Sequence, residues 1–577
     1  MPKGPPPKDV LDWLGLTRDP DWRVARPLGA VFGALLILSV PALFLAALVA
    51  AFVSLYHVIL GSAALGSPSS NGLGASTLIV ALLSAPFLVW RTIIAHRTLG
   101  FQKEGHITDR ISKAVEQLGA EKTVKRQLVN SHGTKVFKKH DDGSIDDATP
   151  VLEEVTVPNI EVRIGAILSL ERIAQDSVNY DKGRDHVRVM EILCAYIPEN
   201  APAASAQGHA FGEWLRLDQA ATKKERAAHE VKRRARFGSH YSEGLVHKWA
   251  RSLPPPREDI ALALKVLGRR DAAQRQVEAR WGKDAAPDAT WVFDEPVPSL
   301  PDQEEPFGTA ILDDYAARLG DWKDRIRSYR GYRLDLHHTN LQGADLSGLV
   351  LSGALLHRAR LQGASLIKAR LQGAFLRNAR LGGAYLREVQ MEGAILDQAQ
   401  LEGASLMQAE MTGASLQGAR LNGTSLLSTR ATGANFGGTQ LEVANFLEAR
   451  LERVWLDVTG LEGACLRGTK LEGAYISNAQ VDGVEFYGAR LTGAALQNVN
   501  LTSAGITQDR IESCFGDATV IVPPGRSRPA HWPLWDLSHQ YINEWRKWRA
   551  DPANYVPPPP SATQADTTEE AGFDDQK

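Results

Sequence analysis

Cysteine is scarce in this sequence: the 577 residues include three, which lie far apart at Cys194, Cys465 and Cys514. None belongs to a CxxC pair or has histidines at ligand spacing, which excludes a disulfide framework or a thiolate zinc site and indicates a reducing compartment. An excess of one charge is also lacking, since 65 Lys and Arg face 67 Asp and Glu, for a formal net charge of −2. The composition therefore marks neither a nucleic-acid binder nor an acidic tail protein.

Catalytic signatures are missing as well. The sequence has no GxSxG, HExxH, phosphate-binding lysine loop or GxGxxG in a suitable context. His337 and His338 are adjacent, and their place just before a long repeat favours a role in closing its start over metal binding. Residues 139–142 form a polar cluster whose flanks predict an exposed loop. We therefore predict no enzyme and no cofactor, with no catalytic, cofactor-binding or metal-binding residues.

Charge is absent altogether from residues 27–90, a stretch of 64 residues. Residues 30–55 lie within it and residues 77–94 extend four residues beyond it, to include Arg91, and both are apolar runs of the length that a transmembrane helix needs, roughly 17–25 residues. Basic residues precede the first run and follow the second, while the loop between them has none. The positive-inside rule then predicts a transmembrane hairpin over residues 27–97 with both ends in the cytoplasm. A cleaved signal peptide fits less well, because the leading segment is too long and a second run follows.

The rest of the chain divides by composition into further segments. Apolar residues at helical spacing over residues 158–176 and 186–197 predict helices in the middle of the chain. Residues 535–548 predict a helix that covers the open end of the repeat. The predicted segments are 1–26, a cytoplasmic N-terminal segment; 98–283, an α-helical cytoplasmic domain; 284–307, an acidic Pro-rich linker; 308–335, a helical lead-in; 336–506, the repeat; 507–550, a C-terminal cap; and 551–577, a disordered tail.

One stretch of the middle segment, residues 223–236, is strongly basic. We consider two interpretations of a helix there. It contacts anionic lipid headgroups, or it has a solvated face on which Glu225 and Glu230 pair with basic residues one turn away. Its position after a membrane hairpin favours lipid over RNA among the binding roles. The candidate lipid-contact residues are Lys223, Lys224, Arg226, Lys232, Arg233, Arg234 and Arg236.

The C-terminal half is dominated by a repeat of five. From Leu336 to Ile506 every fifth residue is apolar, and a small or β-branched residue stands two places before nearly all of them. A period of five fits neither a straight helix nor a plain strand, whereas a short extended piece followed by a turn satisfies it. Glycine stands two places after the apolar residue in most alternate repeats, where a turn with positive φ is expected.

This pattern resembles the pentapeptide-repeat family, whose consensus A(D/N)LXX is matched at residues 344–346 and 434–436. The resemblance covers about 171 residues without a slip in register. It implies a right-handed quadrilateral parallel β-helix with four fives per coil, about 40 Å long at roughly 4.8 Å per layer. The stretch VRIGAILSLERIAQDS and the ending GDAT…RPAHW are similar to those of bacterial membrane-anchored pentapeptide-repeat proteins, which mostly have no assigned activity.

Some members of this family imitate duplex DNA and protect topoisomerases, which requires an acidic rod. Here the repeat from Leu336 to Ile506 holds 14 acidic and 14 basic residues, which disfavours DNA mimicry. Stacked basic side chains are predicted to form a candidate interaction ladder, with acidic ladders on nearby faces. We favour the interpretation that the basic and acidic ladders neutralise each other over one in which the basic ladder docks a partner. The basic ladder is Arg430, Arg450, Lys470 and Arg490, and the acidic ones are Glu442, Glu462 and Asp482, with Glu452 and Glu472.

The layout as a whole predicts a multi-domain scaffold anchored in a bacterial inner membrane, with a rigid β-helix presented to an unidentified protein partner in the cytoplasm. The alternative is an oligomeric transport- or channel-associated subunit, since small residues along the first span permit close helix packing and a homo-oligomer. Neither span carries an ionisable residue in its middle, which argues against conduction. A third hypothesis places an enzyme within residues 98–335, and only the unexplained length of this segment supports it.

Overall fold

The structure is a computed structural model that describes residues 107–560, apart from 181, 210, 212–213, 215–221, 240–241, 302–304 and 306, and a few isolated residues nearer the N-terminus. The predicted transmembrane hairpin, residues 27–97, lies outside the described residues except at those isolated positions. Within the described part, no helix combines the length and apolarity that crossing a membrane requires. Residues 110–577 form one compact unit.

The middle segment begins with strands. After a helical stretch at residues 107–118, β1 (Glu121–Gln127) pairs antiparallel with β4 (Leu152–Pro158), and β2 (Phe137–Lys139) pairs antiparallel with β3 (Ile145–Pro150). The prediction of an α-helical domain therefore does not hold over residues 121–158. The reason is visible in the cross-strand pairs, where β-branched Val124 faces Val155 and Thr123 faces Thr156. Residues 140–143 form the turn between β2 and β3, as the predicted loop requires.

Four helices follow and pack into a small bundle: α4 (Ile160–Tyr180), α5 (Arg184–Asn200), α8 (Glu258–Gly268) and α9 (Ala272–Ala279). The helices predicted at residues 158–176 and 186–197 are confirmed as α4 and α5. Their apolar stripes meet in a core that includes Ile167, Leu193 and Leu264, all fully buried. The connection after α5 contains the short helix η2 (Ala203–Ser205).

This bundle closes the first edge of the repeat. In the coils, the residue before each core residue donates its N–H to the preceding coil, as Leu355 does to the Leu334 carbonyl at 2.8 Å. The first coil has no predecessor, so Asn340 donates instead to Ala201 after α5, at 2.7 Å, and Val350 donates to Gly268 at the end of α8, at 3.0 Å. Edge donors that would otherwise template aggregation are thereby satisfied.

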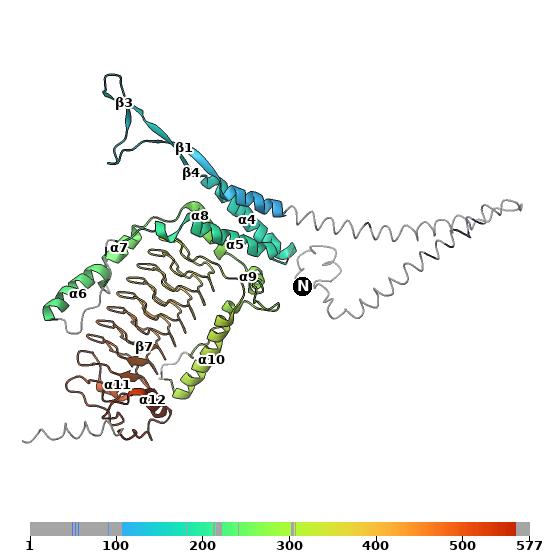
Figure 1. The fold of residues 1–577 in the computed structure, drawn as a ribbon. Helices are drawn as coiled ribbons and strands as arrows, with labels where there is room; N and C mark the ends of the chain where they lie inside the picture. The colour runs from blue at the N-terminus through green and yellow to red at the C-terminus, as the bar shows by residue number, and fades with distance from the viewer. Residues whose placement is uncertain are drawn as a thin grey trace, which may run out of the picture. The chain divides into compact units, whose positions relative to one another are not determined.

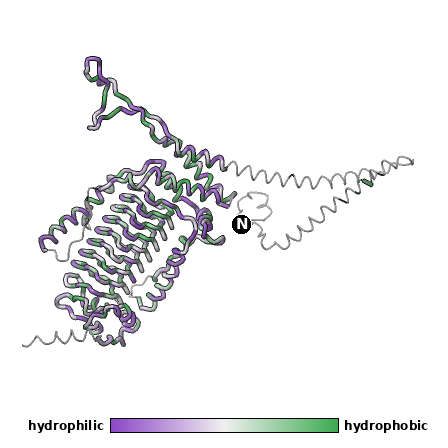
Figure 2. The backbone as a smooth tube through the Cα atoms, viewed as in Figure 1, coloured by the Kyte–Doolittle hydropathy of each residue, from purple (hydrophilic) through white to green (hydrophobic). Residues whose placement is uncertain are grey.

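The repeat is a four-sided solenoid, in which every fifth residue from Asp335 onward bridges in parallel to a residue one coil later, nearly always 20 places on (Figure 1). The predicted coil of four fives is confirmed. The apolar residue at every fifth position from Leu336 to Ile506, called here the core residue, is buried in every case. Most pairings are single bridges, and two are longer, joining the strands β7 (Trp455–Asp457), β8 (Tyr475–Ser477) and β9 (Ala495–Gln497). Figure 2 shows hydrophobic positions recurring around each coil.

Two segments of the chain lie along the solenoid on different sides (Figure 1). The first strap, residues 222–254, contains α6 (Lys223–Phe237), β5 (Gly238–Ser239), β6 (Ser242–Glu243) and α7 (Leu245–Arg251). The second strap, residues 291–328, contains η3 (Val292–Asp294) and α10 (Thr309–Ser328). Each strap runs over one column of corners, where a corner is the pair of residues that follows a core residue.

The straps explain why glycine alternates in the repeat. The second corner residue has a positive φ whether or not a strap covers the corner. Arg358 and Lys368, for example, have φ of +58° on corners that no strap covers. Under the straps there is in addition no room for a Cβ: one placed on Gly363 lies 2.3 Å from the Ala250 carbonyl oxygen, and one on Gly393 lies 2.9 Å from the Trp322 ring. Glycine is therefore needed at these corners for close approach as well as for conformation.

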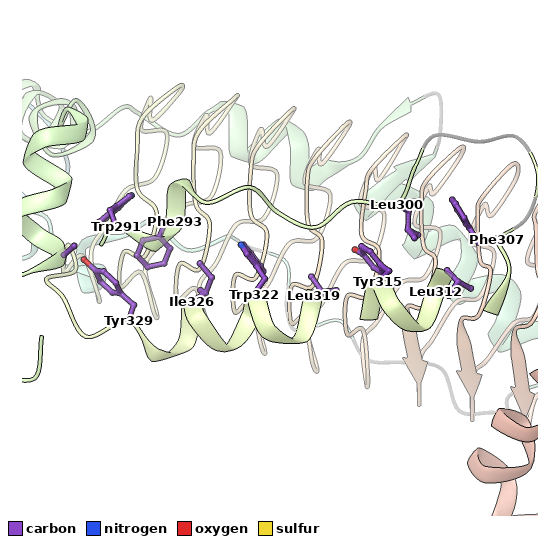
Figure 3. Close-up of a cluster of buried hydrophobic side chains, with 11 residues drawn as sticks. Trp291, Phe293, Leu300, Phe307, Leu312, Tyr315, Leu319, Trp322, Ile326 and Tyr329 are labelled. Atoms are coloured by element: carbon purple, nitrogen blue, oxygen red, sulfur yellow. The ribbon is translucent and has the colours of Figure 1, made fainter. Parts of the chain in front are cut away.

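A hydrophobic cluster holds the second strap against the solenoid (Figure 3). Side chains of α10 point toward the coils, with Tyr315, Trp322 and Ile326 almost completely buried. Trp291, Phe293 and Phe307 join the same cluster from the stretch predicted as a linker. The described residues of the segment 284–307 therefore include apolar side chains that pack on the solenoid, between the Pro and acidic positions that suggested a linker.

The last coils are covered by the C-terminal segment, which contains α11 (Gln508–Glu512), η4 (Ser538–Gln540) and α12 (Tyr541–Ala550). Leu501 donates to the Ile521 carbonyl at 2.9 Å, so residues after the repeat continue the hydrogen-bond pattern at the second edge. The predicted terminal helix is confirmed as α12, but it packs on the side of the last coils, against Tyr475 and Phe515. Part of the predicted disordered tail is ordered, since the Tyr555 hydroxyl donates to Glu544 at 3.1 Å.

Candidate interaction surfaces of the solenoid

Each side of the solenoid presents one column of outward-facing residues, made by the residue before each core residue. Pairing at a spacing of 20 stacks these residues directly over one another. One column is basic over its later half, one is rich in Arg and Gln, one is rich in Ser, and one is apolar. The apolar column is Leu355, Phe375, Ile395, Ser415, Asn435, Trp455, Tyr475, Ala495 and Phe515.

The predicted basic ladder stacks as the spacing requires, through the bridges Arg430 to Arg450, Arg450 to Lys470 and Lys470 to Arg490. Acidic side chains lie close to three of its four members. They are joined by the pairs Arg430 Nε to Glu410 Oε1 at 3.7 Å, Arg450 Nε to Glu452 Oε1 at 3.2 Å and Arg490 Nη1 to Glu472 Oε1 at 3.9 Å. The net field of this side is therefore weak.

The predicted acidic ladders lie at the covered corners. Glu452 and Glu472 are fully buried beside the second strap, where the Thr432 hydroxyl donates to Glu452 at 2.8 Å. Glu442 is buried beside the first strap and accepts a hydrogen bond from the Trp214 indole at 3.2 Å. Glu442, Glu452 and Glu472 therefore lie inside strap contacts, whereas Glu462 is half-buried and Asp482 is exposed. Sequence spacing located the stacks, but not the segments that cover them.

Two buried glutamates beside the second strap, Glu472 and Glu392, are poorly compensated. Glu392 Oε2 and both carboxylate oxygens of Glu472 have no hydrogen-bond partner among the described residues. Burial raises the pKa of Glu392 to about 7, and the neighbouring Glu410 carboxylate adds to the effect. Burial likewise raises the pKa of Glu472 to about 7. Both groups are thus poised to lose a proton near neutral pH.

We expect Glu392→Gln to make the protein less sensitive to pH. Because the folded-state pKa of Glu392 lies above its usual value of 4.5, the folded state binds the extra proton, and stability falls as pH rises from 4.5 to about 7. Glutamine stays neutral, so the variant should be more stable than the wild type by about 2–3 kcal/mol at pH 8 and nearly equal to it at pH 4.5. Urea denaturation at both pH values measures this.

The matched control is Glu448→Gln, a change on an exposed corner, which should leave the pH dependence of the urea midpoint as it is. A Glu392→Gln variant that keeps the wild-type fall in stability between pH 4.5 and pH 8 would contradict a protonated Glu392.

The basic helix α6 is divided between two environments. It starts with a capping box formed by Thr222 and Glu225, and Glu230 pairs with Arg234 at 2.5 Å, as the solvated alternative predicts. The Arg236 guanidinium lies over Trp214 at 5.7 Å and Phe237 at 5.4 Å, and burial lowers its pKa. Arg233 is half-buried toward the solenoid. The other candidate lipid-contact residues are exposed: Lys223, Lys224, Arg226, Lys232 and Arg234.

The histidine pair lies at the first coil, as predicted. The His338 carbonyl accepts a hydrogen bond from Ala203 at 2.7 Å, which ties the helical bundle to the solenoid. His337 stacks on His357 with ring centroids 5.0 Å apart and bonds to Asp335. The described residues include no group of His, Cys, Asp or Glu side chains arranged to hold a metal ion.

A ridge on one uncovered corner was not predicted. The residue directly after the core residue in every fourth five is often large and apolar there, and Tyr487 is 73% exposed. Glycines on the uncovered corners, such as Gly418 and Gly468, meet only the neighbouring coil. Large apolar residues recur every 20 positions in the sequence at this corner, but the stronger repeat of five made that pattern hard to see. The apolar ridge consists of Ile367, Met407, Leu427, Leu447 and Tyr487, interrupted by Arg387 and Arg467.

The geometry defines a four-sided parallel β-solenoid with a packed interior. The model of the Pentapeptide repeats family matches this part of the chain in eight copies, and the repeat region is therefore a pentapeptide-repeat domain. No curated protein matches the chain. The matched residues are 335–373, 374–413, 384–423, 409–446 and 461–502.

Solved structures of several pentapeptide repeat proteins are similar to this chain. HetL from the cyanobacterium Nostoc sp. strain PCC 7120, described as involved in heterocyst differentiation regulation, is 26% identical, with 40% of this chain and 97% of that chain covered and a TM-score of 0.19. Rfr23 from the cyanobacterium Cyanothece 51142 is 37% identical over 16% of this chain and 58% of that chain, with a TM-score of 0.13. QnrB1, a plasmid-mediated fluoroquinolone resistance protein, is 18% identical over 34% and 96%, with a TM-score of 0.14.

Proposed function

We propose that this chain is a non-enzymatic, membrane-anchored scaffold that presents its pentapeptide-repeat solenoid to a protein partner. The observation that carries the proposal is the apolar ridge, which lies on a corner that neither strap covers. A row of large apolar side chains between arginines is the composition that protein interfaces favour. The solenoid interior is filled by core residues, which leaves the outer surface as the place for recognition.

The rigidity of the ridge supports the same role. Its residues sit on corners whose backbone is fixed on both sides by hydrogen bonds to adjacent coils, as when Leu426 donates to Asn445 at 2.7 Å and Ser428 donates to Leu447 at 2.9 Å. A surface held in this way loses little conformational entropy on binding. The stacked basic ladder, which begins at Arg430, is a second and weaker candidate surface because glutamates accompany it.

Anchoring rests on the sequence. The uncharged residues 27–90 and the basic residues that flank them support a hairpin in a bacterial inner membrane, with both termini and the solenoid in the cytoplasm. In this proposal the exposed bases of α6, among them Lys223 and Lys224, contact anionic lipid headgroups. Membrane fractionation of the full chain beside a chain lacking residues 27–97 tests the anchor, which predicts that only the full chain sediments with membranes.

A triple substitution on the ridge tests the scaffold role. Met407→Glu, Leu427→Glu and Leu447→Glu place three charges in a column on a half-buried surface, and we expect loss of the proximity-labelled partners of the full chain. The fold should survive, because the side chains lie outside the core. The measurement is quantitative mass spectrometry of labelled proteins, with circular dichroism to verify folding.

The control for this experiment uses the other uncovered corner. Gln398→Glu, Gln417→Glu and Val458→Glu add the same charge to exposed positions away from the ridge and should leave the labelled set unchanged. A folded ridge variant that labels the same proteins at wild-type levels would remove the ridge from the proposal.

A further inference from the structure

A groove of about 450 Å³ lies where three parts of the chain meet: the first turns of α10, the coils around residues 453–475, and α12. These parts are far apart in the sequence but adjacent at one end of the solenoid, where α12 lies near β7 (Figure 1). The groove belongs neither to the apolar ridge nor to the basic ladder. It has its own chemistry, which the proposed scaffold role does not use.

One wall of the groove is aromatic. Trp455 and Tyr475 stack with ring centroids 4.1 Å apart, and Trp545 of α12 lies 6.0 Å from Tyr475. Trp455 is 40% exposed, whereas Tyr475 and Trp545 are nearly buried. The outer ring therefore offers a free edge and face beside a fixed aromatic base, an arrangement suited to a further aromatic side chain.

The other wall is basic. Arg453 donates to Asp313 of α10 at 2.6 Å, and Arg549 of α12 donates to the same carboxylate. Arg546 is exposed one turn away on α12, and its charge helps to lower the pKa of Arg453, for which burial is the main cause. The lining of the groove thus holds three arginines and a single carboxylate, which pairs with two of them. An excess of positive charge beside aromatic rings fits an acidic segment that carries an aromatic residue.

The chain contains such a segment immediately after the described residues. Residues 561–577 hold five acidic residues and a single base, Lys577, and their only aromatic residue is Phe573. The acidic residues flank that phenylalanine on both sides and are Asp566, Glu569, Glu570, Asp574 and Asp575.

The last described part of the chain packs on α12, which forms one wall of the groove. Tyr555 is fixed on α12 through its bond to Glu544 and packs against Phe515 with ring centroids 5.7 Å apart. The 13 residues that follow Pro560, up to and including Phe573, span at most about 45 Å when extended. A tether of this length holds the segment at a high effective concentration near α12, so that a weak contact is well populated.

We propose that residues 561–577 bind in this groove, with Phe573 against Trp455 and Tyr475 and the flanking carboxylates against Arg546 and Arg453. The segment then covers the exposed aromatic ring and neutralises the excess positive charge. The groove is thus an intramolecular docking site, which is occupied by the chain's own acidic segment.

The test measures binding of a fluorescein-labelled peptide of residues 561–577 by fluorescence anisotropy. The partner is the chain truncated after Pro560, which keeps every described residue. We expect the peptide to bind the truncated chain and to bind the full chain at least about tenfold more weakly, because the tethered segment competes. Equal binding to both chains, or no binding to the truncated chain, overturns the proposal.

Substitutions locate the contact. Arg546→Glu in the truncated chain should weaken peptide binding about tenfold, and the peptide with Phe573→Ala should bind about tenfold more weakly to the unchanged groove. The control Arg526→Glu reverses the charge of an exposed arginine outside the groove lining and should change affinity less than twofold. A peptide that binds equally with and without Phe573, or equally to Arg526→Glu and Arg546→Glu, follows net charge alone and overturns the proposal.

A second copy of the chain is the competing occupant. If the groove joins two copies, the truncated chain forms a concentration-dependent dimer that Arg546→Glu abolishes, and sedimentation velocity shows it. That result, together with absent peptide binding, overturns the intramolecular site. A truncated chain that stays monomeric and binds the peptide supports it.

Discussion

Gly363→Asn is expected to lower the free energy of unfolding by about 2–3 kcal/mol, the upper range for overpacking, because its Cβ meets backbone instead of a movable side chain. The nearest atom is the Ala250 carbonyl oxygen of α7, at 2.3 Å. Asparagine tolerates the positive φ of this corner, so backbone strain contributes little. The loss should instead appear as detachment of the first strap, seen as faster hydrogen exchange across α7.

The same substitution on an uncovered corner separates the two explanations for glycine. Gly418 has nearly the same φ, +66° against +68° for Gly363, but its Cβ meets only Gln398 Cγ, at 3.7 Å. Gly418→Asn should therefore cost less than about 1 kcal/mol and leave exchange in α7 unchanged. Equal losses for the two variants would mean that conformation alone, and not the strap, selects glycine in the repeat.

Glu278→Ala is expected to cost about 3–5 kcal/mol, the range for breaking a buried ion pair by removing one partner. Glu278 is fully buried in the helical bundle, where it pairs with Arg270 at 2.5 Å and His186 at 2.8 Å. Arg270 also donates to the Val350 carbonyl of the solenoid at 2.8 Å, so the same network joins the bundle to the first coils. Removing the carboxylate leaves a buried guanidinium without its counter-charge.

Urea denaturation followed by circular dichroism measures this loss, and Glu171→Ala provides the comparison. Glu171 lies 4.0 Å from Arg269 at the edge of the same bundle, where an ion pair contributes about 0–1 kcal/mol. If the two alanine variants unfold at similar urea concentrations, the buried network does not hold the bundle to the solenoid.

The repeat was predictable because one rule governs every coil. A core residue at each fifth position and a small residue two places earlier specify an extended piece and a turn, and the structure buries each core residue from Leu336 to Ile506. The register of the basic ladder followed from the same rule, since Arg450 and Lys470 are one coil apart.

The straps were not predictable from the same kind of reasoning. Trp322 and Ile326 have the spacing of any amphipathic helix, and nothing in that spacing names the surface they cover. The alternating glycines did mark the surface that the straps cover, but the sequence interpretation explained these glycines by their φ alone. Because Arg358 adopts the same φ without being glycine, the alternation instead records which corners are covered.

The candidate surfaces were predicted only in part for a related reason. Sequence spacing stacks Glu452 and Glu472, but burial by a segment more than 100 residues away decides that they are internal. The aromatic groove was not predicted from the sequence, because Trp455 and Trp545 come together only when α12 packs on the last coils. Contacts between distant segments leave no periodic trace in a sequence.

The straps also fix the number of coils in the solenoid. A repeat protein whose coils touch only their neighbours can gain or lose a coil with little harm. Here α10 meets Gly373, Gly393, Gly413, Gly433 and Gly473 in succession, through Ile326, Trp322, Leu319 and Leu312, and Leu319 contacts two neighbouring coils. Deleting or inserting 20 residues in the solenoid would leave a helix of fixed length facing coils for which its side chains are not spaced. The length of this rod is thereby set from outside, by the helices that lie along it.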